Sequence, residues 1–108
     1  MFHNYSPRPE YDFKRLNFIW GVHMNIIEWV AEHDEEILTA HGFDYALIGV
    51  CERAGQPTIA VYDTDKCINL LRERDGMTEE EAEEYFYYNV VGSYSGEYTP
   101  GFIRLYKE

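Results

Sequence analysis

Residues 44–63, DYALIGVCERAGQPTIAVYD, decide the fold class because they contain two apolar runs separated by a turn. The run at 44–52 is predicted to be a buried strand, and the run at 58–63 a second strand. Between them, ERAGQP has the glycine and proline that are typical of a turn. A connection of this length predicts an antiparallel β-hairpin.

A helix is predicted directly after the hairpin. Asp63 or Thr64 is a suitable N-cap, and the helix is expected to run to about Arg74. Asp75 and Gly76 would end it, since glycine is favoured just beyond a helix C-terminus.

A second helix is predicted from Thr78, because Thr78 and Glu81 form an S/T-x-x-E capping box. Steps of three and four residues predict an inward stripe, which comprises Ala82, Tyr85, Phe86, Asn89 and Val90. The same spacing places an acidic and aromatic set outward, namely Glu80, Glu83, Glu84, Tyr87 and Tyr88. Gly92 is expected to end this helix.

The chain then enters SYSGEYTPG, 93–101, which is predicted to be a loop because Gly96 and Gly101 permit positive φ and Pro100 stiffens the exit. Its polar side chains are candidates for a ligand-binding mouth, although Tyr94 packed over the core is the structural alternative. FIRLY, 102–106, alternates weakly and is a candidate third strand.

Upstream of the hairpin, Pro7 and Pro9 predict an irregular N-terminal arm over 1–10. Residues 11–33 have helical periodicity with an apolar band too broad for a helix with one buried edge. That band predicts either a central helix or a homodimer contact through 11–33. Asp34 is a candidate N-cap for a short helix that ends at His41, within a second acidic group that includes Glu35 and Glu36.

These elements predict one domain over 1–108 of the α+β class, with a small antiparallel sheet of two or three strands packed against several helices. The chain has 20 acidic and 9 basic residues, a net charge of −11. Such a surface repels nucleic acid and anionic membranes and attracts basic partners. Solubility is the alternative explanation for the charge.

The sequence has no recognisable catalytic, metal or phosphate-binding frame. Cys51 and Cys67 occur without a CxxC pair, and there is no HExxH, GxGxxG or phosphate-binding lysine motif. We therefore predict no enzymatic activity, no catalytic residue, no metal and no cofactor. No apolar signal core or transmembrane-length segment is found, which predicts a cytosolic protein.

Two segments together resemble a group of small, uncharacterised proteins encoded by tailed bacteriophages. The first has the pattern IGV-x-E/D-R-x-GQ-x-x-x-x-VYD, and the second GMT-x-EEA-x-EYF-x-x-N-x-x-G-x-Y-x-G-E-x-TP. The positions that match include Ile48, Arg53, Gln56, Tyr62, Asp63, Gly76, Thr78, Glu84, Phe86, Asn89, Tyr94, Glu97 and Pro100. The resemblance covers roughly residues 44–102 and implies a phage gene product acting in the bacterial cytoplasm.

The leading hypothesis is an acidic binding protein that engages and inhibits a basic host protein, such as a nucleic-acid-binding or defence protein. Carboxylates on the last helix would imitate a row of phosphates, with tyrosines as anchors. The predicted partner-binding residues are Glu80, Glu83, Glu84, Tyr87, Tyr88, Tyr94 and Glu97. The alternatives are a small-ligand-binding or enzymatic domain with a pocket at the 93–101 loop, and an accessory protein of the virion.

Overall fold

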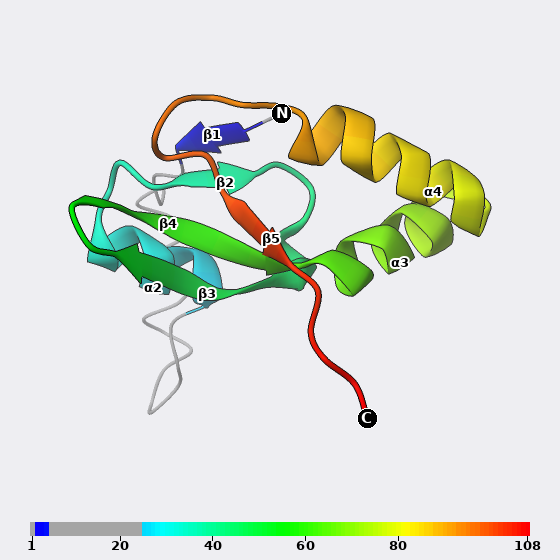
Figure 1. Cartoon of the computed structure of the whole chain (residues 1–108), viewed down its shortest axis with the longest axis horizontal. Helices are drawn as coiled ribbons and strands as arrows, with labels where there is room; N and C mark the ends of the chain where they lie inside the picture. Colours follow the sequence, from blue (N-terminus) through cyan, green and yellow to red (C-terminus); the bar gives the residue numbers. More distant parts are fainter. Residues whose placement is uncertain (1, 5–24) are drawn as a thin grey trace, which may run out of the picture.

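The computed structural model describes residues 2–4 and 25–108 and confirms the α+β class (Figure 1). In chain order the elements are β1 (Phe2–Asn4), α2 (Ile26–His33), β2 (Leu38–Ala40), β3 (Leu47–Arg53), β4 (Gln56–Asp63), α3 (Thr64–Asp75), α4 (Glu79–Tyr85) and β5 (Gly101–Ile103). A 3₁₀ turn over Asp44–Ala46 precedes β3, and a π-helical segment over Phe86–Val91 continues α4.

The predicted hairpin is confirmed: β3 and β4 pair antiparallel, with Val50 opposite Ala60 and Arg53 opposite Gln56. Gly55 occupies the turn with φ of 71°, a backbone conformation that favours glycine. The third strand is also present, but it is shorter than expected and pairs parallel with β4. The sheet is therefore mixed, in the order β3-β4-β5, because the α3–α4 crossover returns the chain in the direction of β4.

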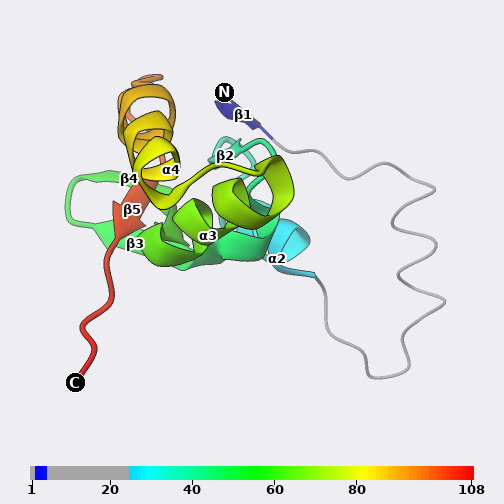
Figure 2. The same ribbon diagram turned by 90° about the vertical axis from the view of Figure 1, so that its right-hand side faces the viewer.

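The two helices after the hairpin begin where the sequence predicts. The Asp63 side chain accepts a hydrogen bond from the Lys66 amide at 3.1 Å and caps α3. At the other end Gly76 adopts φ of 69° and donates its amide to the Leu71 carbonyl. Figures 1 and 2 show α3 and α4 side by side, with α2 on the opposite side of the molecule from α4.

The core lies between the sheet and the three helices. Its largest fully buried side chains include Tyr62, Phe86, Leu71 and Val30, from β4, the π-helical segment, α3 and α2. Phe102 of β5 stacks on Tyr62 with ring centroids 5.5 Å apart and meets Phe86 edge-on at 5.3 Å. These ring contacts fix the short β5 against both the sheet and the helix that follows α4.

Upstream of the hairpin, the helix predicted over 11–33 is confirmed for residues 26–33, whereas the short helix predicted between Asp34 and His41 is wrong. The helix α2 begins only at Ile26, because Asn25 is extended and its side chain accepts the Glu28 amide as an N-cap. The rest of the predicted 11–33 helix, and with it most of the proposed dimer contact, lies outside the described residues.

No helix forms between Asp34 and His41. The Asp34 carboxylate accepts the Glu36 amide at 2.9 Å, which closes a tight turn instead of capping a helix. The chain then extends as β2, which pairs antiparallel with β1, so that Phe2 lies opposite Ala40. Phe2–Asn4 is therefore a strand and not part of an irregular arm; the other residues of the predicted arm are not described.

A buried hydrogen bond links the two sheets. The Ala40 amide of β2 donates to the Tyr62 phenol oxygen of β4 at 2.7 Å, and both residues are fully buried. Burial raises the pKa of the Tyr62 phenol well above its usual value, so the hydroxyl stays neutral. A buried amide without an acceptor is costly, and this bond therefore specifies where β2 lies.

We expect Tyr62→Phe to destabilise the protein by roughly 1–3 kcal/mol, because it leaves the Ala40 amide buried without its acceptor. The matched control is Tyr45→Phe, since the Tyr45 side chain is 75% exposed; its effect should stay within about 0.5 kcal/mol. Urea unfolding followed by circular dichroism measures both. Equal midpoints for the two variants would show that the bond does not contribute.

Candidate interaction surface

The capping box at the start of α4 is confirmed. The Glu81 amide donates to Thr78 Oγ1 at 3.2 Å, and the Thr78 amide donates to Glu81 Oε1 at 2.9 Å. These bonds lower the pKa of the Glu81 carboxyl, so it is ionised at neutral pH. The box fixes the direction in which the rest of α4 presents its side chains.

The inward stripe of this helix is narrower than predicted. Ala82, Phe86 and Val90 are fully buried, at successive steps of four residues. Tyr85 and Asn89, which the pattern also placed inward, are exposed. Val90 lies within the π-helical segment that begins at Phe86, whereas Tyr85 is the last residue of α4 and has 36% of its surface exposed.

The outward prediction is confirmed for all five residues. We call Glu80, Glu83, Glu84, Tyr87 and Tyr88 the acidic face; each of them is exposed. Tyr88 has 78% of its surface exposed and Tyr87 46%. Within the part of the chain that the structure describes, no hydrogen bond or ion pair engages the carboxylates of this face, so its charge is directed to solvent.

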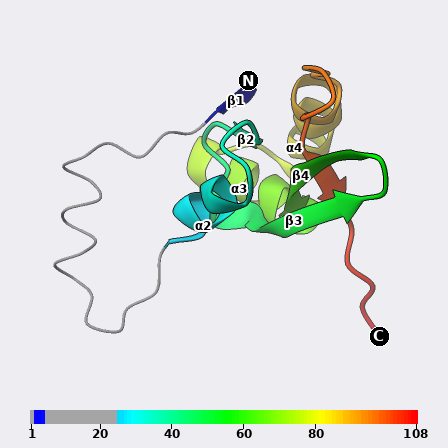
Figure 3. The same cartoon turned by 90° about the vertical axis from the view of Figure 1, so that its left-hand side faces the viewer.

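Tyr87 differs from Tyr88 because the C-terminal segment holds its hydroxyl. Arg104 donates to Tyr87 Oη at 2.7 Å and to Asp65 Oδ1 at 2.9 Å. Lys107 pairs with the other oxygen of the same Asp65 carboxylate at 3.2 Å. Figure 3 shows that the segment after β5 extends from the body of the protein on the side away from α2. Tyr87 therefore takes part in an internal contact, whereas Tyr88 projects outward.

A groove of about 620 Å³ follows α4 beside the acidic face. We call it the tyrosine groove; its lining residues are Met77, Glu81, Glu84, Tyr85, Tyr88 and Asn89. The sequence did not identify four of these, since Met77 precedes the helix, Glu81 is assigned to the capping box, and Tyr85 and Asn89 are predicted to face the core. The groove combines the apolar and aromatic side chains of Met77, Tyr85 and Tyr88 with the carboxylates of Glu81 and Glu84.

The loop at 93–101 is ordered by its own side chains and by two distant residues. Thr99 Oγ1 accepts the Ser95 amide at 2.8 Å and donates to the Gly96 carbonyl at 2.7 Å. Arg53, at the hairpin turn, donates to the Glu97 carbonyl at 3.2 Å. The alternative in which Tyr94 packs over the core is wrong, because Tyr94 is 79% exposed.

It is Tyr98 that packs against the core, and its hydroxyl donates to Asp34 Oδ2 at 3.1 Å. The hydrogen bond to Asp34, together with nearby Glu36 and Glu97, raises the pKa of the Tyr98 phenol. The loop is in this way tied to the turn that follows α2. The sequence gives no signal for this pairing, since 64 positions separate the two residues.

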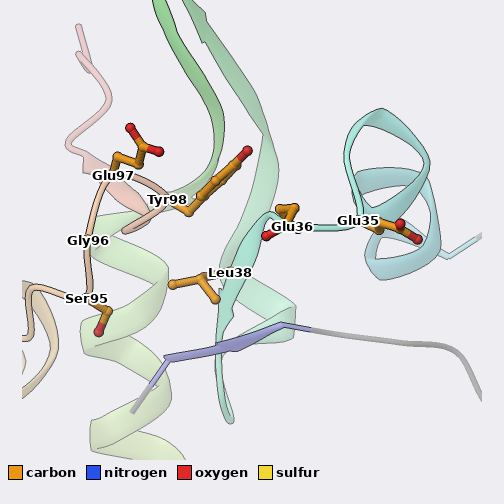
Figure 4. Close-up of a pocket in the computed structure, with 7 residues that line it drawn as sticks. All are labelled: Glu35, Glu36, Leu38, Ser95, Gly96, Glu97 and Tyr98. Atoms are coloured by element: carbon orange, nitrogen blue, oxygen red, sulfur yellow. The ribbon is translucent and has the colours of Figure 1, made fainter.

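A second pocket, of about 590 Å³, lies between the loop and that turn. We call it the loop pocket; it is lined by Glu35, Glu36, Leu38, Ser95, Gly96, Glu97 and Tyr98. In Figure 4 the loop residues form one side, Glu35 and Glu36 the other, and Leu38 lies between them. Its three carboxylates make it an acidic pocket.

The predicted partner-binding residues therefore lie in separate places. Glu84 and Tyr88 line the tyrosine groove, Glu97 lines the loop pocket, and Tyr94 lines neither. Only the helical members form one surface, which periodicity predicts well. The loop members depend on long-range contacts that periodicity does not register.

Neither cysteine belongs to a metal cluster. Over residues 2–4 and 25–108 no three His, Cys, Asp or Glu side chains lie close enough to hold a metal ion. Cys51 is half-buried and Cys67 buried, and both are free thiols. In the same part of the chain, no helix has the length and apolar content that crossing a bilayer requires.

Comparison with protein-family models, with curated proteins and with solved structures finds no match for this chain. Functional inference therefore rests on the geometry of the surface, the groove and the pocket.

We expect the free energy of unfolding to fall as the pH rises above 9. Burial raises the pKa of the Cys67 thiol from 9.0 to about 12, so the unfolded chain loses this proton before the folded one does. The loss from this group approaches about 1.4 kcal/mol per pH unit between those values. Tyr62, whose pKa is also raised, adds to the decline above pH 10.

Urea unfolding at pH 8 and at pH 10.5 measures the decline. A Cys67→Ala variant serves as the control, since it lacks the thiol: it should be less stable at pH 8 but lose less stability on going to the higher pH. An identical decline in the parent protein and the variant would contradict the assignment to Cys67.

Proposed function

We propose that this protein is a binding protein that recognises a positively charged partner through the acidic face of α4. The observation that carries the proposal is the set of exposed carboxylates, Glu80, Glu83 and Glu84, beside a Tyr88 side chain that is 78% exposed. Exposed tyrosine with surrounding charge is typical of residues that dominate binding energy at interfaces.

The net charge of the protein also supports a positively charged partner. The net charge of −11 attracts cations and repels nucleic acid. The described cations are largely engaged elsewhere: Arg53 with backbone carbonyls, Arg74 with Asp75, Arg104 and Lys107 with Asp65. Among the residues that the structure describes, no cation forms an ion pair with the acidic face, which supports recognition of a cation supplied by a partner.

The resemblance to small phage proteins suggests what the partner is. A basic protein of the bacterial cytoplasm, such as a nucleic-acid-binding or defence protein, carries the cationic channel that spaced carboxylates would occupy. Occupying that channel would inhibit the host protein by excluding its nucleic acid. Association would be fast at low salt and slower as the ionic strength rises.

We expect a tagged protein to capture a basic partner from bacterial lysate at low salt and to lose it at high salt. Changing Glu80, Glu83 and Glu84 together to Gln should abolish capture, because the attraction comes from these charges. The matched control changes Glu52, Glu73 and Glu108 to Gln, which removes the same number of exposed carboxylates elsewhere.

Mass spectrometry of the eluates identifies the captured protein, and thermal unfolding checks that both variants are folded. Capture that is lost only in the α4 variant supports the proposal. Equal capture by both variants, or no salt-sensitive capture by the parent protein, would overturn it.

The loop pocket favours a second candidate, a protein that binds a small cationic ligand. Glu35, Glu36 and Glu97 are among the residues that line it, together with the side chains of Tyr98 and Leu38. A di- or polyamine has both the charge and the alkyl chain that such a pocket would take up.

In a thermal-shift screen, spermidine should raise the melting temperature of the parent protein if this candidate is right, because a ligand that binds only the folded state stabilises it. Glu97→Gln should reduce the shift and Glu52→Gln should leave it unchanged. A shift that is equal in both variants would indicate nonspecific charge binding and reject the pocket.

A further inference from the structure

We infer that the tyrosine groove receives an arginine side chain of the partner, with the guanidinium against Tyr88 and Glu84. This inference rests on the proposed function and specifies which chemical group the surface recognises. It depends on the groove's lining, on the charge balance around it, and on the way the protein binds one of its own arginines.

The lining has the two features that an arginine side chain requires. Met77, Tyr85 and Tyr88 offer apolar and aromatic surface to the aliphatic stem and to the planar face of the guanidinium. Glu84 and Glu81 offer carboxylates at the edge, and Asn89 offers an amide oxygen. A neutral or anionic side chain would leave these carboxylates without compensation.

Glu84 is the carboxylate available to the ligand. One Glu81 oxygen already accepts the Thr78 amide in the capping box, so Glu81 is fixed in position. Over the described ranges 2–4 and 25–108, no hydrogen bond or ion pair engages the Glu84 carboxylate. Glu81 adds a second negative charge to the tyrosine groove. A guanidinium can donate two parallel hydrogen bonds to one carboxylate, which favours arginine over lysine here.

On the adjacent side of the same helix the protein binds its own arginine with the same chemistry. Arg104 donates a hydrogen bond from Nη1 to the Asp65 carboxylate at 2.9 Å and another from Nη2 to the Tyr87 hydroxyl at 2.7 Å. The hydrogen bond to Tyr87 raises the pKa of the Arg104 guanidinium, and the charges of Asp65 and Glu83 add smaller contributions. A carboxylate and a tyrosine thus hold one guanidinium beside Tyr87, and the groove beside Tyr88 presents the same pair to solvent.

The two tyrosines are neighbours in sequence but differ in exposure, at 46% for Tyr87 and 78% for Tyr88. Tyr87 contacts Arg104 through its hydroxyl and meets the Phe86 ring edge-on at 5.1 Å, whereas Tyr88 lines the open groove. We therefore expect an external arginine to bind beside Tyr88 without displacing the C-terminal segment.

The test uses the whole protein and a capped Gly-Arg-Gly peptide, with Gly-citrulline-Gly and Gly-Lys-Gly as matched peptides. Citrulline keeps the shape of arginine and lacks its charge. The Met77 methyl and the Asn89 side-chain amide are the NMR reporters, because both line the groove. We expect saturable shifts at both reporters with arginine, weaker binding with lysine and none with citrulline.

Two variants of groove residues test whether the arginine peptide binds in the tyrosine groove. Glu84→Gln and Tyr88→Leu should each weaken the arginine peptide about three- to tenfold, by removing the charge or the aromatic face. Glu73→Gln and Tyr106→Leu are the controls, since both residues are exposed and lie outside the groove; they should bind as the parent does.

Shifts confined to residues around Asp65 and Tyr87, or equal affinity for citrulline, would overturn the inference. So would unchanged affinity in both groove variants. If peptide binding fails while the lysate capture still depends on the α4 carboxylates, the proposed function stands and only the arginine assignment falls. If both fail, the acidic face is not a binding surface for cationic partners.

Discussion

The hydrogen bond from the Ala40 amide to the Tyr62 hydroxyl is the contact on which the arrangement of the molecule depends. It joins the β1–β2 pair to the middle strand of the larger sheet, inside a region from which water is excluded. The hydroxyl of Tyr62 accepts this bond and its ring stacks on Phe102, so this side chain of β4 contacts both β2 and β5. With β2 fixed, the turn at Asp34 is placed where Tyr98 can reach it, and the 93–101 loop is set in turn.

Local sequence signals were sufficient for the parts of the fold that local interactions determine. The hairpin follows from two apolar runs around a glycine turn, and α3 and α4 from Asp63 and the Thr78–Glu81 capping box. The failures occurred where a distant contact overrides local preference. Asp34 is a good helix N-cap in isolation, but here its carboxylate closes a turn and accepts the Tyr98 hydroxyl, and Leu38–Ala40 pairs with Phe2–Asn4 instead of coiling. Strands of three residues are too short to show the alternation of apolar and polar residues from which a strand is predicted.

The candidate surface was predictable to the same extent and for the same reason. Helical spacing correctly turned Glu80, Glu84 and Tyr88 to solvent, yet it placed Tyr85 and Asn89 in the core, because spacing alone does not tell how wide the buried stripe of a helix is. Tyr85 and Asn89 instead line the tyrosine groove together with Glu84. Tyr94 and Glu97 were grouped with the helix on composition alone, and the fold places Glu97 in a different pocket. The position of the loop depends on Arg53 and Asp34, which no local rule connects to it.

The parallel pairing of β5 with β4 has a consequence for how this molecule can vary. Everything from Thr64 to Pro100, including α3 and the helix α4 that carries the acidic face, is an excursion whose two ends are fixed on adjacent strands. Substitutions on the solvent side of α4 change neither strand register nor the buried row of Ala82, Phe86 and Val90. The solvent side of α4 can therefore change in sequence while the hairpin keeps its register. An exterior that varies independently of its frame is what the proposed binding function would require.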